Sequence, residues 1–215
     1  AAHELGRFVA AEEADSGTDL LLVGLGSATR EEDLTAATAL VAALLGREPV
    51  AMIGTDTGAG SAGGLTDRAW TRRVVATRDA LRRTRTTPAP DDAELLRLLG
   101  GGRIAVLVGL LQQATVRRTP VLLDGTVTCA AALAAERLSP GSRHWWSAAT
   151  TSPEPAAGAA LTELRLRPLL DLGVRTGDGT AALLALPVLE AAIDAAGALA
   201  RGAPAAEAPA GGSGG

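Results

Sequence analysis

The sequence has no lysine, a single cysteine, and aromatic residues at only 2% of its 215 positions. One cysteine excludes an intrachain disulfide and fits a reducing compartment, so we expect a cytoplasmic protein. Arginine supplies all 20 basic residues, against 24 acidic ones, and the net charge of −4 provides no basic field for nucleic acid. No run of 18 apolar residues is free of glycine, proline or charge, and we therefore predict no membrane contact.

Hydrophobic residues make up 47% of the chain, which is enough for one substantial core built from alanine, leucine and valine. We expect residues 1–201 to form this domain and residues 202–215, rich in alanine, proline and glycine, to be a disordered tail. The N-terminus resembles no secretory signal, and it lacks an initial methionine, as expected for a fragment of a longer protein.

Short apolar runs alternate with helical patterns, which predicts an α/β fold with a mostly parallel, Rossmann-like sheet flanked by helices. Residues 104–116 fit either one helix or a strand followed by a helix, and Pro187 predicts a kink or break in the last helix. The expected strands are residues 19–23, 120–123 and 143–151. The expected helices are residues 2–14, 34–45, 66–83, 93–99, 127–138, 157–164 and 180–201.

Three loops combine glycine with polar residues where a strand gives way to a helix: residues 24–29, 124–128 and 176–180. In a parallel sheet the carboxyl ends of the strands line one crevice, where ligands bind. Glycines let a backbone approach a phosphate closely, so the three loops together indicate a phosphate-containing ligand. The first loop matches a dinucleotide fingerprint only weakly, because its third glycine is missing.

Few other residues suggest chemistry. His3 is expected to be solvated, His144 to have a structural role, and Cys129 to be a small core residue. No spacing of histidine, cysteine and carboxylate residues indicates a metal site. Asp178, between Gly177 and Gly179 before an apolar helix, fits two roles: a helix cap, which the local pattern favours, or a base beside a phosphate-bearing substrate.

Four stretches occur in the order and spacing of one enzyme family. They are VGLGSAT at residues 23–29, VLLDGTVTCAAALAA at 121–135, SPEPAA at 152–157 and LRPLLDLGVRTGDGTAALLALP at 166–187. Taken together, these motifs resemble those of the nicotinate-nucleotide–dimethylbenzimidazole phosphoribosyltransferases. The last stretch is long and specific, and the resemblance corresponds to the C-terminal two-thirds of the family.

This resemblance implies transfer of phosphoribose from nicotinate mononucleotide to 5,6-dimethylbenzimidazole, giving α-ribazole 5′-phosphate for cobalamin, with no metal or other cofactor. It also implies a homodimer, and it implies that part of a small helical subdomain is absent from this sequence. Asp178 falls at the position of the catalytic acid, and Arg73 near that of a phosphate-binding lysine. The other implied substrate-binding or phosphate-binding residues are Gly24, Gly26, Ser27, Thr29, Asp124, Ser152, Glu154, Gly177 and Gly179.

The site motifs depart from the family at several positions. Asp178 replaces a glutamate, Ser27 an asparagine and Thr126 a phenylalanine. The shorter acid withdraws the base by about 1.5 Å, and a misplacement of roughly 1 Å costs a rate factor of about a hundred. Two interpretations therefore stand: an enzyme of cobalamin assembly, or a diverged, non-catalytic member that binds nucleotide or a protein partner.

Overall fold

The computed structural model describes residues 1–25, 30–55, 66–171, 173–174 and 176–202, and it divides into compact units of residues 1–185 and 186–215. The first unit contains a parallel sheet whose strands lie in chain order: β1 (Leu21–Val23), β2 (Val121–Leu123), β3 (Trp146–Thr150) and β4 (Pro168–Leu170). This confirms the parallel α/β fold and the three expected strands. The fourth strand was not predicted.

The expected helices are present, with small shifts at their ends. Residues 104–116 lie in a single helix, and the last helix continues through Pro187, so a break there is wrong, while a kink stays a prediction. The helices are α1 (Ala2–Asp15), α2 (Glu31–Leu45), α3 (Asp67–Thr84), α4 (Asp92–Leu95), α5 (Gly101–Arg117), α6 (Thr126–Leu138), α7 (Pro155–Leu164) and α8 (Thr180–Gly202). Single turns η1 (Pro49–Met52), η2 (Leu96–Gly100) and η3 (Ser142–Trp145) connect them.

Local side-chain chemistry accounts for several helix ends. The Thr66 hydroxyl accepts a hydrogen bond from the Ala69 amide at 3.3 Å, and the Asp91 carboxylate accepts one from the Glu94 amide at 2.8 Å. Gly46 ends α2 in the left-handed conformation, with φ of 60°. The tail predicted at residues 202–215 lies almost wholly outside the described residues.

The strand order determines which face of the sheet each helix covers. Parallel strands that advance in one direction through right-handed crossovers place all the connecting helices on the same face. Side chains alternate between the two faces along a strand, so Val121 and Leu123 pack in the main core with α2, α5 and α6. Leu122 and Ala149 point to the other face, where Ala181 and Ala185 at the start of α8 cover them.

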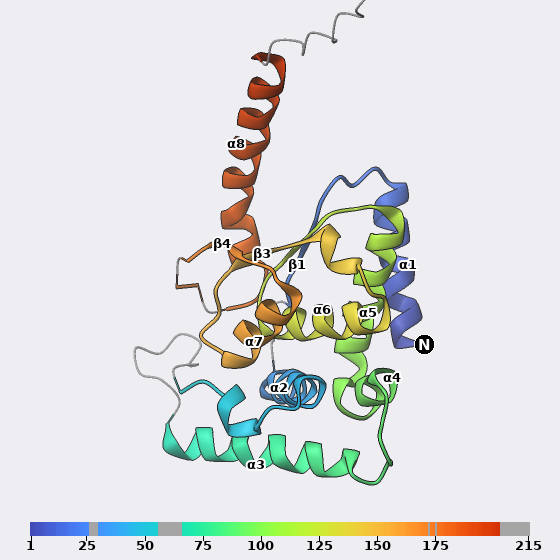
Figure 1. The fold of residues 1–215 in the computed structure, drawn as a ribbon, viewed down its shortest axis with the longest axis vertical. Helices are drawn as coiled ribbons and strands as arrows, with labels where there is room; N and C mark the ends of the chain where they lie inside the picture. The colour runs from blue at the N-terminus through green and yellow to red at the C-terminus, as the bar shows by residue number, and fades with distance from the viewer. Residues whose placement is uncertain (26–29, 56–65, 172, 175, 203–215) are drawn as a thin grey trace, which may run out of the picture. The chain divides into compact units, whose positions relative to one another are not determined.

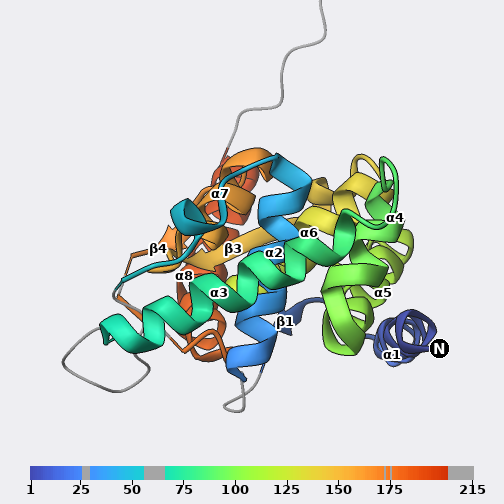
Figure 2. The ribbon, with the colours of Figure 1, turned by 90° about the horizontal axis from the view of Figure 1, so that it is seen from below.

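The connecting helices form more than one layer. α6 and α7 lie next to the sheet, α2 packs against both, and α3 packs on the side of α2 away from the sheet (Figures 1 and 2). α1 lies along α5, and both helices present glycine at the contact (Figure 1). A Cβ added at Gly6 would lie 1.8 Å from the Val106 carbonyl oxygen, so the two backbones touch there.

Within the second unit, the described residues are the remainder of α8, from Leu186 onward. By length and composition, Thr180–Arg201 is apolar enough to cross a membrane, although it contains Glu190, Asp194 and Arg201. A single helix of this kind also occurs in soluble proteins. The expected absence of membrane contact therefore stays a prediction.

Candidate active site

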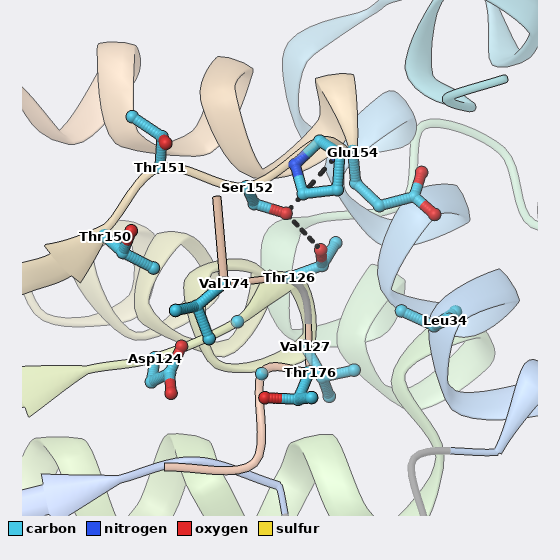
Figure 3. Close-up of a pocket in the computed structure, with 13 residues that line it drawn as sticks. Leu34, Asp124, Thr126, Val127, Thr150, Thr151, Ser152, Glu154, Val174 and Thr176 are labelled. Carbon is cyan, nitrogen blue, oxygen red and sulfur yellow. Dashed lines mark hydrogen bonds between the residues drawn. The ribbon is translucent and has the colours of Figure 1, made fainter. Parts of the chain in front are cut away.

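A cavity lies where β2 and β3 end and where the chain leaves β4. Residues following all three strands contribute to its lining, together with Leu34 from α2 (Figure 3). Its volume is about 90 Å³. The lining residues are Leu34, Asp124, Gly125, Thr126, Val127, Thr150, Thr151, Ser152, Pro153, Glu154, Val174, Thr176 and Gly177.

Asp124 forms one wall of this cavity, directly after β2. Its side chain is buried, and one carboxylate oxygen accepts hydrogen bonds from the amides of Gly179 and Ala181, both at 3.0 Å. Burial raises the pKa of Asp124, and these amide hydrogen bonds offset only part of that rise. The nearby charge of Asp178 adds to the increase in the pKa of Asp124.

Glycines bring three loops into backbone contact beside Asp124. A Cβ added at Gly24 would lie 2.2 Å from the Gly179 nitrogen, and one added at Gly125 would lie 2.6 Å from the Gly177 Cα. The Leu25 amide also donates to the Gly177 carbonyl at 3.0 Å. The loop after β1, the loop after β2 and the turn before α8 therefore hold one another without intervening side chains.

Asp178 lies on that turn and caps the helix that follows it. Its carboxylate accepts hydrogen bonds from the Thr176 hydroxyl at 2.7 Å and from the Thr180 amide at 3.0 Å. Hydrogen bonds from Thr180 and Thr176 lower the pKa of Asp178 to about 2. The two aspartates thus have pKa values shifted in opposite directions, because burial dominates at Asp124 and hydrogen bonds from Thr180 and Thr176 dominate at Asp178.

A buried ion pair lies behind the wall of the cavity that is opposite Asp124. The Arg73 guanidinium, from α3, lies 2.7 Å from the Glu154 carboxylate, and the two side chains are only 3% and 4% exposed. The other oxygen of Glu154 accepts a hydrogen bond from the Gly54 amide at 3.1 Å. Glu154 therefore connects three distant segments: the start of α7, α3, and the chain after η1.

Hydroxyl groups occupy the space between these walls. The Thr126 and Ser152 hydroxyls lie 3.2 Å apart, and Ser152 also accepts from the Glu154 amide at 3.3 Å (Figure 3). Thr150 lines the same cavity, is 8% exposed, and its buried hydroxyl has no hydrogen-bond partner among the described residues. The cavity thus offers hydroxyls to a polar group.

The structure brings most of the sequence-predicted site residues together. Asp124, Ser152, Glu154 and Gly177 line the cavity. Gly24 and Gly179 meet beside it. Arg73 does not line it but pairs with Glu154 from behind. Gly26, Ser27 and Thr29 lie outside the described residues.

Sequence reasoning missed Thr150, Thr151 and Val174. Thr150 is the last residue of β3 and Thr151 follows it, as Asp124 follows β2, so the strand-end rule could have identified both. Val174 follows β4, which the sequence did not reveal.

The remaining candidates stand apart from the cavity. His144 is exposed on η3, while His3, expected to be solvated, is half-buried and bonds to Gln112 at 2.7 Å. Cys129 is buried in the core as expected, and burial raises the pKa of its thiol to about 12. In the part of the chain that the structure describes, no group of three histidine, cysteine or carboxylate residues converges to hold a metal ion.

Comparison with known proteins identifies the family. A family model described as "Phosphoribosyltransferase" matches residues 1–206. The chain belongs to this family. This phosphoribosyltransferase family member is 48% identical over 193 residues to the nicotinate-nucleotide–dimethylbenzimidazole phosphoribosyltransferase of Mycobacterium avium, covering 88% of the chain and 52% of that protein. It is 49% identical over 193 residues to the enzyme of the same name from Mycobacterium leprae, covering 88% of the chain and 51% of that protein.

Solved structures agree with the sequence comparison. The crystal structure of CobT from Thermus thermophilus matches with a TM-score of 0.76 and 35% identity, over 89% of this chain and 54% of that one. A second structure from the same organism, titled as a nicotinate-nucleotide–dimethylbenzimidazole phosphoribosyltransferase, matches with a TM-score of 0.75 and 34% identity, over 89% of this chain and 53% of that one. The family member thus spans about half the length of the relatives it matches.

Proposed function

We propose that the chain transfers phosphoribose from nicotinate mononucleotide to 5,6-dimethylbenzimidazole, releasing nicotinate and forming α-ribazole 5′-phosphate in cobalamin biosynthesis. The observation that carries this proposal is the 48% identity, over 88% of the chain, to a relative named for that reaction. The part of the chain that aligns with this relative contains a cavity at the carboxyl ends of parallel strands, where α/β proteins bind ligands.

The reaction needs a base, because a benzimidazole nitrogen attacks the ribose while the other nitrogen loses its proton. We assign this role to Asp178, which stands beside the cavity-lining residues Thr176 and Gly177. With a pKa of about 2, Asp178 is ionised at neutral pH and free of a proton, although so low a pKa makes a weak base. The hydrogen bonds from Thr176 and Thr180 both go to one oxygen of this carboxylate, and we assign acceptance of the substrate proton to the other oxygen.

We assign the phosphate and ribose to the hydroxyl-lined part of the cavity and to the glycine loops beside it. Ser152 and Gly177 line this space, and Gly24 and Gly179 border it. Arg73 supplies positive charge only if Glu154 releases it, since the two now pair at 2.7 Å. A homodimer remains a prediction of the family resemblance, and a cytoplasmic location remains a prediction from the single cysteine.

A second candidate function is nucleotide binding without turnover. The observation that favours it is the capping role of Asp178, whose carboxylate is engaged by Thr176 and Thr180. These hydrogen bonds lower the pKa of Asp178 to about 2, far below the range of an efficient general base, whereas capping needs no proton transfer.

The test is to incubate the chain with nicotinate mononucleotide and dimethylbenzimidazole and to follow α-ribazole 5′-phosphate and nicotinate by chromatography. We expect product from the unmodified chain and about a hundredfold less from Asp178→Asn. Asp92→Asn, in the first turn of α4, is the matched control and should retain activity. Equal turnover by Asp178→Asn would refute the base assignment, and binding of nicotinate mononucleotide without product would support the second function.

A further inference from the structure

Asp124 connects the end of β2 to the start of α8, two segments far apart in the sequence. One oxygen of its carboxylate accepts hydrogen bonds from both the Gly179 amide and the Ala181 amide, each at 3.0 Å, and the side chain is buried. The first amides of a helix have no partner within the helix. Asp124 therefore caps α8 from another part of the fold.

The turn that carries Asp178 depends on these contacts for its position. The hydrogen bonds of the Asp178 side chain go to Thr176 and Thr180, which belong to the same turn and so do not fix it against the cavity. The contacts that do fix it come from outside: Asp124 bonds the Gly179 amide, and Leu25 bonds the Gly177 carbonyl. The Asp124 contact comes from a side chain, whereas Leu25 acts through its backbone, as do Gly24 and Gly125 where they touch the turn.

We propose that Asp124 is a positioning residue: it fixes the turn of residues 176–180 and thereby places the Asp178 carboxylate at the edge of the cavity. This inference rests on the proposed function only for its effect on turnover, since the hydrogen bonds exist with or without catalysis. It assigns Asp124 no proton transfer and no contact with substrate, although Asp124 lines the cavity. The contrary possibility, that Asp124 is itself the base, makes different predictions.

Three substitutions separate position from charge. Asp124→Asn keeps one acceptor oxygen at the same distance from the backbone but removes the charge. Asp124→Glu keeps the charge but lengthens the side chain by one methylene and displaces the turn. Asp124→Ala removes the acceptor altogether. Asp91→Ala is the matched control, because Asp91 caps α4 through the Glu94 amide and lies outside the cavity lining.

We measure kcat, KM and the pH profile for α-ribazole 5′-phosphate formation. The positioning role predicts that Asp124→Ala and Asp124→Glu lower kcat by about a hundredfold, with little change in KM for nicotinate mononucleotide. Asp124→Asn is expected to lower kcat at least about tenfold less than Asp124→Ala does and to leave the acid limb of the profile in place, whereas Asp91→Ala is expected to leave kcat unchanged. The proposal would be overturned, and Asp124 would be the base, if Asp124→Asn were as inactive as Asp124→Ala. The same conclusion would follow if the pH profile of Asp124→Asn lacked its acid limb.

Amide hydrogen exchange tests the same inference without any turnover. We expect the Gly179 and Ala181 amides to exchange at least about tenfold faster in Asp124→Ala than in the unmodified chain, and little faster in Asp124→Asn. Unchanged exchange in Asp124→Ala would overturn the proposal. A chain that makes no product but shows the expected exchange pattern would refute the proposed function alone. If circular dichroism shows Asp124→Ala to be unfolded, the comparison of Asp124→Asn with Asp124→Glu decides the question.

Discussion

The two walls of the cavity are built in contrasting ways. On one side, Gly24, Gly125, Gly177 and Gly179 bring backbones together directly. On the other, Arg73 and Glu154 meet as a buried ion pair that also holds the Gly54 amide. The first wall depends on the absence of side chains, and the second depends on two charges.

This difference indicates how each wall can respond to a ligand. Backbone contacts have one geometry and no charge to exchange, so the glycine wall is suited to holding a fixed position. An ion pair can exchange one partner for another, but Arg73 is buried behind Glu154 and does not line the cavity, so a phosphate reaches it only if Glu154 moves. The predictions below disturb one wall at a time, or compare a wall with a site outside the cavity.

The largest effect is expected from breaking the ion pair. Glu154→Ala leaves the Arg73 charge buried opposite a neutral side chain, which should lower the free energy of unfolding by about 3–5 kcal/mol. Urea denaturation followed by tryptophan fluorescence measures this loss.

The double variant Arg73→Leu with Glu154→Leu is the control for that experiment. Replacing both charges with apolar groups should recover most of the stability, since the cost comes from an unpaired buried charge. A double variant as unstable as Glu154→Ala would show that the bond to Gly54, not the ion pair, carries the stability.

The next effect is expected at the glycine wall. Gly24→Ala would place a methyl group 2.2 Å from the Gly179 nitrogen, and two backbones would have to separate. We expect a loss of roughly 1–3 kcal/mol in unfolding free energy by urea denaturation, together with reduced turnover. Gly158→Ala in α7 is the matched control, because a Cβ there meets nothing within 4 Å. If the two variants are equally stable, the close contact is not required.

A smaller effect is expected for a cap outside the cavity. Asp91→Ala removes the acceptor for the Glu94 amide and should cost about 1 kcal/mol in the same assay. Product formation should remain unchanged. A loss of turnover here would mean that capping anywhere in the fold affects the reaction, and the special role of Asp124 would be lost.

The smallest effect concerns pH. The folded-state pKa of Asp124 lies above its unfolded value of about 3.9, so the native state binds more protons between these values. Ionisation of Asp124 therefore lowers stability as pH rises from about 4 through its raised pKa. We expect unfolding of Asp124→Asn, measured in urea from about pH 4 to about pH 8, to lack this decline. A decline of equal size in both proteins would assign it to other groups.

Helix positions and the parallel sheet could be predicted because apolar periodicity and glycine stops are local signals. β4 could not, because it is short and begins with Pro168, which argues against a strand. The pairing of Arg73 with Glu154 also escaped prediction, since no local pattern links residues so distant in the sequence. For Asp178 the local pattern favoured a cap, and the structure confirms a cap; whether it is also a base stays a prediction.

The position of the turn before α8 has a consequence for the order of folding. The sheet and its connecting helices use residues up to Leu170, but the cavity also needs Gly177, and the second face of the sheet needs Ala181 and Ala185. During synthesis from the N-terminus, Gly24, which follows β1, cannot form its backbone contact until Gly179 has been synthesised. The binding site is therefore completed only by the last residues of this unit to be synthesised, after all four strands.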